Sequence, residues 1–232
     1  MNLPRQATKI AFTKTFIGLC LLVAAVAWRQ NAGKPSGSSG DVPSTNAMPF
    51  SKGTYTYKTA GDCKIKADVY RLPRDQAGPA ILWIHGGALI SGDRNGLRRE
   101  QLERYLKAGF AVVSIDYRLA PETKLKGIIE DLQDAYKWLR SEGGRLKIDP
   151  DRIGVIGHSA GGYLTLMAGF CLSPRPKALV SFYGYGDVAA EWYSRPDPFY
   201  SQQPAVPKEE AYAAVGGPVI SENPNRNRSR FY

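Results

Sequence analysis

Histidine is scarce in this sequence. The 232 residues contain two, His85 and His158, and no histidine follows His158. Cysteine is nearly as rare, with three residues, and no group of cysteines and histidines has the spacing of metal ligands. The sequence therefore gives no reason to expect a bound metal ion, and no cofactor is expected either.

A hydrophobic run long enough to cross a membrane is also missing. The apolar stretch near the N-terminus covers residues 16–28, which is 13 residues, whereas a helix that spans a bilayer needs about 20. Ala25-Val26-Ala27 offers a cleavage site of small residues at its end. The preceding residues include three basic ones and no acidic one: Arg5, Lys9 and Lys14. The pattern predicts a signal peptide over residues 1–28, or an N-terminal anchor if it stays uncleaved. The protein is then expected to be secreted or periplasmic.

The basic excess of the chain does not point to a nucleic acid. The formal net charge is +10, but apart from a short arginine-rich stretch over residues 226–230 the basic residues are spread along the sequence. A spread excess of this kind is typical of a solvated surface. No nucleic-acid partner is expected, and contact with a membrane is expected only if residues 1–28 remain attached. The sequence carries no signal for an oligomeric state.

Residues 29–49 are predicted to be a flexible linker, because residues 33–49 hold three glycines, three prolines and four serines. One folded domain is expected over residues 50–232. Strand-like and helix-like patterns alternate along its first two thirds, which predicts a mostly parallel sheet with helices on both faces, an α/β fold. The predicted strands cover residues 54–59, 64–70, 80–84, 110–115, 153–156 and 178–183, and the predicted helices cover 96–108, a stretch around 128–139, and a segment after 159.

Two cysteines remain once the signal segment is set aside, Cys63 and Cys171. Each lies in an element that is expected to contribute to the core. Export would permit a disulfide between them, but two buried free thiols are the preferred interpretation.

Ser159 has the sequence setting of a nucleophile. It lies in Gly157-His158-Ser159-Ala160-Gly161, directly after a predicted strand and before a predicted helix. This G-x-S-x-G pattern is typical of a sharp strand-to-helix turn on which the serine hydroxyl stands clear of the sheet. Gly157 and Gly161 are expected where side chains would collide across that turn. The backbone N–H of Ala160 is expected to stabilise an oxyanion.

A second motif, His85-Gly86-Gly87-Ala88, directly follows the predicted strand at residues 80–84. Successive glycines allow the backbone to approach a substrate and to direct N–H groups toward it. A tight structural turn is the alternative interpretation. The presence of both motifs, in this order, favours the functional one.

With these motifs the chain resembles the α/β-hydrolase fold, and within it the esterases of the hormone-sensitive-lipase-like or α/β-hydrolase fold-3 group. Residues 115–122, which read Ile-Asp-Tyr-Arg-Leu-Ala-Pro-Glu, also resemble that group. The resemblance implies that Ser159 is the nucleophile and that Asp116 and Arg118 hold structure through an ion pair and a turn. The implied oxyanion hole consists of backbone N–H groups of Gly86, Gly87 and Ala160, with Ala88 standing where the family often has a third glycine.

The acid and the histidine of the triad are not found in this chain. In this fold both follow the serine, on loops after the last strands, yet no histidine follows Ser159 and only one clear strand does. Asp187 follows that strand but has no histidine to orient. The domain is therefore expected to lack its last strands, to be inactive or severely impaired as it stands, and to be poorly soluble when residues 29–232 are expressed alone.

Three functions remain open from the sequence. The preferred one is a serine hydrolase that acts on small-molecule carboxylic esters. A serine peptidase of the prolyl-oligopeptidase kind shares the serine motif, but the His85-Gly86-Gly87 turn favours the esterase. A non-catalytic binding protein on a hydrolase scaffold would explain the missing histidine.

Overall fold

The computed structural model describes residues 48–187, 189–191, 195–202, 204–224 and 227–231. The predicted signal peptide or anchor at 1–28 lies outside the described residues, as does the predicted linker at 29–49 up to residue 47. Within the described part, none of the helices combines the length and the apolar character that crossing a bilayer requires.

A single six-stranded sheet carries the fold. Its spatial order is β1-β2-β4-β3-β5-β6. The first three strands in this order pair antiparallel, and β4, β3, β5 and β6 run parallel. The strands predicted at residues 54–59 and 64–70 form an antiparallel hairpin, and the predicted mostly parallel sheet is confirmed. The strands are β1 (Ser51–Ala60), β2 (Cys63–Arg71), β3 (Gly78–Ile84), β4 (Ala111–Ile115), β5 (Ile148–His158) and β6 (Ala178–Phe182).

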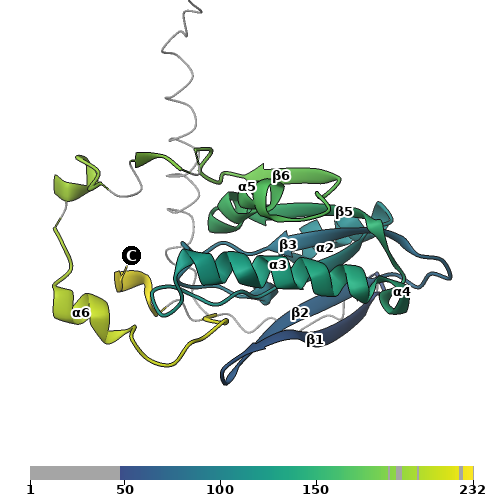
Figure 1. The fold of residues 1–232 in the computed structure, drawn as a ribbon, viewed down its shortest axis with the longest axis horizontal. Coiled ribbons are helices and arrows are strands. Elements are labelled where there is room, and N and C mark those ends of the chain that lie inside the picture. Colours follow the sequence, from purple (N-terminus) through teal and green to yellow (C-terminus); the bar gives the residue numbers. More distant parts are fainter. Residues whose placement is uncertain (1–47, 188, 192–194, 203, 225–226, 232) are drawn as a thin grey trace, which may run out of the picture. The chain divides into compact units, whose positions relative to one another are not determined.

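Helices cover both faces of this sheet (Figure 1). The described residues form the helices α2 (Arg99–Lys107), α3 (Leu125–Ser141), the short α4 (Gly143–Leu146), α5 (Ala160–Cys171) and α6 (Lys208–Ala213), with 3-10 turns at Arg94–Gly96, Tyr200–Gln202 and Ser229–Phe231. The helix expected at 96–108 begins only at Arg99. The carboxylate of Asp93 accepts the N–H of Asn95 at 2.7 Å and holds a separate 3-10 turn, after which Arg98 is extended.

The central strand β3 shows why both faces need cover. Leu82 and Ile84 belong to one buried cluster, together with residues of α3 and α5 such as Leu132. Ile81 and Trp83 face the other side of the sheet, where they belong to a second cluster that contains Leu102 and Leu106 of α2. Because successive side chains of a strand point to opposite faces, this continuous apolar strand is buried on both, as predicted.

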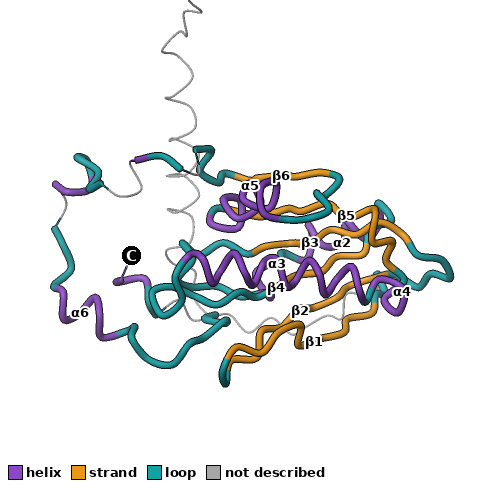
Figure 2. Tube along the Cα trace, in the orientation of Figure 1, coloured by secondary structure: helices purple, strands orange, loops and turns teal. Residues whose placement is uncertain are grey.

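The edge strand β6 is less well covered than the central strands. Leu179, Val180 and Phe182 are each 38–40% exposed. Beyond residue 187 the described residues form loops, short helices and 3-10 turns but no further strand (Figure 2). A half-exposed apolar edge can pair with another strand edge, which is the physical basis of the expected poor solubility.

The two cysteines correct one expectation. Both are free thiols, as expected, but each is only partly buried. Cys63 is the first residue of β2 and Cys171 the last residue of α5, so each lies at the end of its element rather than within the core.

Candidate active site

Ser159 lies on a strained turn between β5 and α5. Its backbone has φ +53° and ψ −118°, a conformation that residues with a side chain rarely adopt. Two backbone hydrogen bonds hold it: the N–H of Ser159 donates to the carbonyl of Phe182 at 2.9 Å, and the carbonyl of Ser159 accepts the N–H of Tyr163 at 3.0 Å. The expected sharp strand-to-helix turn is present.

Two glycines make this turn sterically possible. A Cβ atom on Gly157 would lie 2.1 Å from the carbonyl oxygen of Gly161. A Cβ atom on Gly161 would lie 2.2 Å from the carbonyl oxygen of Ile84 in β3. Both distances are far below van der Waals contact with a backbone atom, which confirms the expected collisions.

The glycine-rich turn after β3 packs directly against the serine. A Cβ atom on Gly86 would lie 2.7 Å from the carbonyl oxygen of His158 and 3.3 Å from the Cβ of Ser159. Gly87 has φ +116°, and its carbonyl accepts the N–H groups of Ile90 and Ser91, both at 3.0 Å. The two sequence motifs are therefore brought together.

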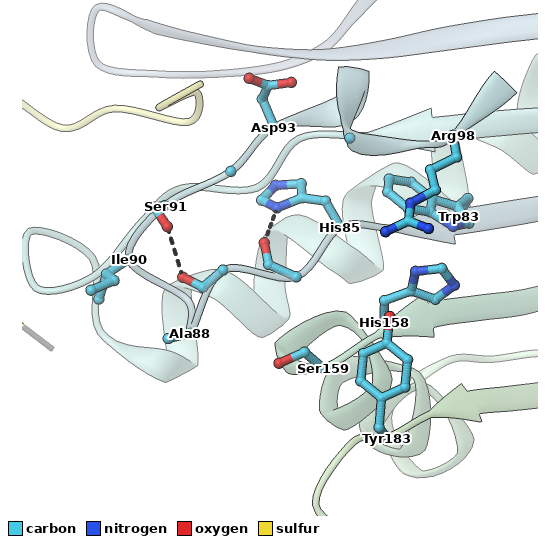
Figure 3. Close-up of a pocket in the computed structure, with 14 residues that line it drawn as sticks. Trp83, His85, Ala88, Ile90, Ser91, Asp93, Arg98, His158, Ser159 and Tyr183 are labelled. Atoms are coloured by element: carbon cyan, nitrogen blue, oxygen red, sulfur yellow. Dashed lines mark hydrogen bonds between the residues drawn. The ribbon is translucent and has the colours of Figure 1, made fainter. Parts of the chain in front are cut away.

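One cavity of about 480 Å³ joins these parts (Figure 3). Ser159 lines it together with Gly86, Gly87 and Ala88. Ala160 is the first residue of α5, so its N–H is among those that have no acceptor within the helix. Four of the five predicted site residues thus face one cavity, and the fifth directly follows the serine.

Neither histidine is bound to Ser159. The ring of His85 is buried and stacks on Tyr117 with 4.2 Å between ring centroids, and its Nδ1 lies 2.7 Å from the carbonyl oxygen of Gly86. Nε2 of His158 lies 3.1 Å from the amide nitrogen of Gln101. Figure 3 shows the side chains of His158 and Ser159 pointing apart, as expected for neighbours on such a turn.

The surroundings of His158 disfavour the charged form of its imidazole. Burial lowers the pKa of its imidazole, and the positive charge of Arg98 lowers that pKa further. The ring also lies edge-on to Trp83, with 5.7 Å between centroids. The His158 ring is directed toward Gln101 and Trp83 rather than toward the serine.

Asp187 and the ion-pairing residues Asp116 and Arg118 are not among the residues that line this cavity. Asp187 is exposed, and its carboxylate accepts the N–H of Ala189 at 3.2 Å. Asp116 and Arg118 do take part in ion pairs, but with partners that the sequence did not predict. Asp116 binds Arg94 at 2.5 Å, and Arg118 binds Asp131 at 2.7 Å. Burial raises the pKa of Asp116 to about 7.

Other residues that line the cavity were missed by sequence reasoning. Ser91 and Asp93 follow the glycine-rich turn so closely that their proximity could have been noticed. Arg98 and Tyr183 gave no signal, because their place depends on how α2 and β6 pack beside β5. Among the described residues no cluster of three or more histidine, cysteine or acidic residues could hold a metal ion.

The sharp turn at Ser159, called the elbow below, and the glycine-rich turn after β3 lie on one sheet. Together they define an α/β-hydrolase fold. A solved α/β-hydrolase superfamily protein from Enterococcus faecalis superposes with a TM-score of 0.60 and 26% identity, over 78% of this chain and 63% of that one. Residues 67–202, more than half of the chain, match the BD-FAE family. The chain therefore belongs to the BD-FAE family, and the expected resemblance to α/β hydrolases is confirmed.

Curated relatives are much longer proteins. The non-reducing polyketide synthase Preu6 of Preussia isomera is 35% identical over 188 residues, which are 75% of this chain and 8% of that protein. The non-reducing polyketide synthase adrD of Penicillium rubens is 31% identical over 212 residues, which are 81% of this chain and 8% of that protein. The chain spans less than a tenth of the length of these relatives.

Proposed function

We propose that this domain is a serine hydrolase for small-molecule carboxylic esters, with Ser159 as its nucleophile. The observation that carries the proposal is the contact between two motifs. Ser159, at positive φ, lies against Gly86, and both line one cavity. A strained serine beside backbone N–H groups that can stabilise an oxyanion is the arrangement that acyl transfer requires.

In the proposed reaction, Oγ of Ser159 attacks the ester carbonyl carbon and its proton passes to a base. The N–H groups of Gly86, Gly87, Ala88 and Ala160 stabilise the negative oxygen of the tetrahedral intermediate. The C–O bond to the alcohol then breaks, and the alcohol leaves with a proton. Water finally attacks the acyl-serine, releasing the acid and restoring the hydroxyl.

We propose that the base for these steps is supplied by a group that is not part of this chain. His85 is stacked on Tyr117, and His158 is directed toward Gln101. The aspartate at 187 has no histidine beside it among the described residues. Because the curated relatives are polyketide synthases, a polyketide ester is a substrate class to include in tests.

A second candidate is a non-catalytic binding domain. It is favoured by one specific observation, namely that no hydrogen bond joins the Ser159 hydroxyl to a histidine within the described residues. The glycines at 157 and 161, which make the strained turn possible, favour the enzyme instead, because a binding scaffold has no need for a strained serine.

Chemical rescue separates the two candidates. Imidazole added to the protein should supply the missing base, since the cavity beside Ser159 is open and large enough for it. We expect hydrolysis of 4-nitrophenyl butyrate to rise with imidazole concentration, by roughly 10-fold or more above the chain alone, because a triad base contributes about 10³-fold or more. Absorbance of released 4-nitrophenol measures the rate.

Ser159→Ala is the matched control, and its rate measures the hydrolysis that imidazole causes without the serine. The serine-dependent rate is the difference between the two proteins. Identical rates for the two proteins at every imidazole concentration would reject the hydrolase and leave the binding domain.

A further inference from the structure

A segment distant in sequence lies behind the glycine-rich turn. Residues 216–224, here called the return segment, come back to the loop that follows β3. The N–H of Gly92 donates to the carbonyl of Asn223 at 3.1 Å, and the N–H of Asn223 donates to the carbonyl of Gly92 at 3.0 Å. This reciprocal pair is a short antiparallel bridge.

Gly92 lies between the Asn223 bridge and the glycine-rich turn. A Cβ atom on Gly92 would lie 2.5 Å from the carbonyl oxygen of Gly86 and 2.8 Å from Nδ1 of His85. Its φ of +92° and this close approach leave it little freedom. The residue bonded to Asn223 is therefore the one that supports the back of Gly86.

A charged cluster fixes the same loop two residues further on. The carboxylate of Glu222 accepts from the Arg94 guanidinium at 2.7 Å and from the Lys66 ammonium at 2.6 Å. Arg94 also binds Asp116 twice, through its backbone N–H at 2.8 Å and its guanidinium at 2.5 Å. Asp68 completes the cluster at 3.2 Å from Nε of Arg94.

The Arg94 side of the cluster is shielded from water, whereas the side chains of Glu222 and Lys66 are each 33% exposed. The Arg94 side chain is 11% exposed, and those of Asp68 and Asp116 are fully buried. Charge-assisted bonds in such a setting are stronger than those at an open surface. Removing the charge of Glu222 would leave the Arg94 guanidinium, whose side chain is 11% exposed, with one carboxylate fewer.

The return segment is anchored independently on its other side. The carboxylate of Glu122 accepts the N–H of Gly216 at 2.8 Å and also pairs with the buried Arg228. The N–H of Leu119 donates to the carbonyl of Ile220 at 2.9 Å. The segment is thus braced against the loop after β4 and can act as a fixed support.

We propose that Glu222 is a positioning residue, which together with the Asn223 bridge holds Gly92 and Arg94 and thereby sets the oxyanion turn at Gly86 and Gly87. The proposal rests on the proposed function only in naming this turn as the oxyanion hole. Arg94 and Glu222 are 128 residues apart in the sequence. Under this proposal the geometry of the site depends on residues far along the chain from the two motifs.

Hydrogen exchange of Glu222→Gln tests the support directly. The substitution keeps the shape of the side chain and removes its charge. We expect the amides of Ile90, Ser91 and Gly92 to exchange about 10-fold faster, the size of effect that the loss of one charge-assisted hydrogen bond produces. Amides of α3 should stay unchanged. Glu209→Gln, on an exposed position of α6, is the matched control.

The kinetic readout uses imidazole-rescued ester hydrolysis. Because an oxyanion hole acts on the transition state more than on the bound ester, Glu222→Gln should lower kcat by roughly 10-fold with KM unchanged. A merely structural role would instead accelerate exchange throughout the sheet. Unchanged exchange at 90–92, or a uniform increase everywhere, overturns the proposal.

A second variant and a separate reading of the activity assay keep the proposal testable. If Glu222→Gln does not fold, Asn223→Pro removes the N–H that donates to Gly92 and should accelerate exchange at the same three amides. If the unaltered protein shows no Ser159-dependent rate, the proposed function has failed, while the exchange result still decides whether Glu222 supports the turn.

Discussion

Gly161→Ala is expected to destabilise the domain by about 3 kcal/mol, at the upper end of overpacking costs. The new Cβ would lie 2.2 Å from the carbonyl oxygen of Ile84 and 2.6 Å from that of His85. Both are backbone atoms at the end of β3, which pairs on both sides with β4 and β5 and cannot move away. The midpoint of urea unfolding at a constant slope measures the loss.

Gly144→Ala is the matched control for this substitution. It lies in the short helix α4, and no atom comes within 4 Å of a Cβ built there. We expect its midpoint to equal or slightly exceed that of the unaltered protein, since alanine favours a helix over glycine. Equal midpoints for the two variants would show that the elbow tolerates a side chain, contrary to the packing described.

Asp131→Asn is expected to cost about 3–5 kcal/mol, the usual cost of breaking a buried ion pair. The Asp131 side chain is fully buried and binds the Arg118 guanidinium at 2.7 Å and the Lys58 ammonium at 2.7 Å. It also accepts the backbone N–H of Arg118 at 3.0 Å. An amide in its place leaves two cations in a shielded site with too little negative charge.

Asp134→Asn isolates the effect of burial. Asp134 also lies 2.7 Å from the Lys58 ammonium, but its side chain is 39% exposed. Loss of that pair should cost less than about 1 kcal/mol, because water replaces an exposed partner. The difference between the two variants in unfolding free energy is the quantity to measure. Similar values for both would contradict a buried anchor at Asp131.

The elements that the sequence predicted share one property, namely that their signals are local. Ser159 could be assigned to a turn because glycines stand at 157 and 161 beside an apolar strand. The strand at 80–84 could be assigned because it is apolar without interruption. Both follow from backbone sterics and burial of residues within a few positions, and the structure has them where expected.

The features that were missed depend on contacts between distant segments. In the sequence nothing distinguishes Arg94 from the many basic residues expected at the surface. In the structure it binds Asp116 and Glu222, which lie in two other parts of the chain. The return segment has no regular pattern, so its bridge to Gly92 could not be predicted. The strand order, which brings Tyr183 to the cavity, is likewise a property of the packed sheet.

The most direct test of Ser159 as the nucleophile is a search for the acyl-enzyme. The 4-nitrophenyl leaving group eases the first attack, whereas the water that removes the acyl group still needs a base, so the intermediate should accumulate in this chain. The protein is treated with 4-nitrophenyl acetate and a little imidazole, quenched in acid and mapped by peptide mass spectrometry. We predict acetyl on Ser159 and none on the serine at 91 in the same cavity. Acetyl on lysines and the N-terminus alone, with Ser159 unmodified at saturating ester, would contradict the account.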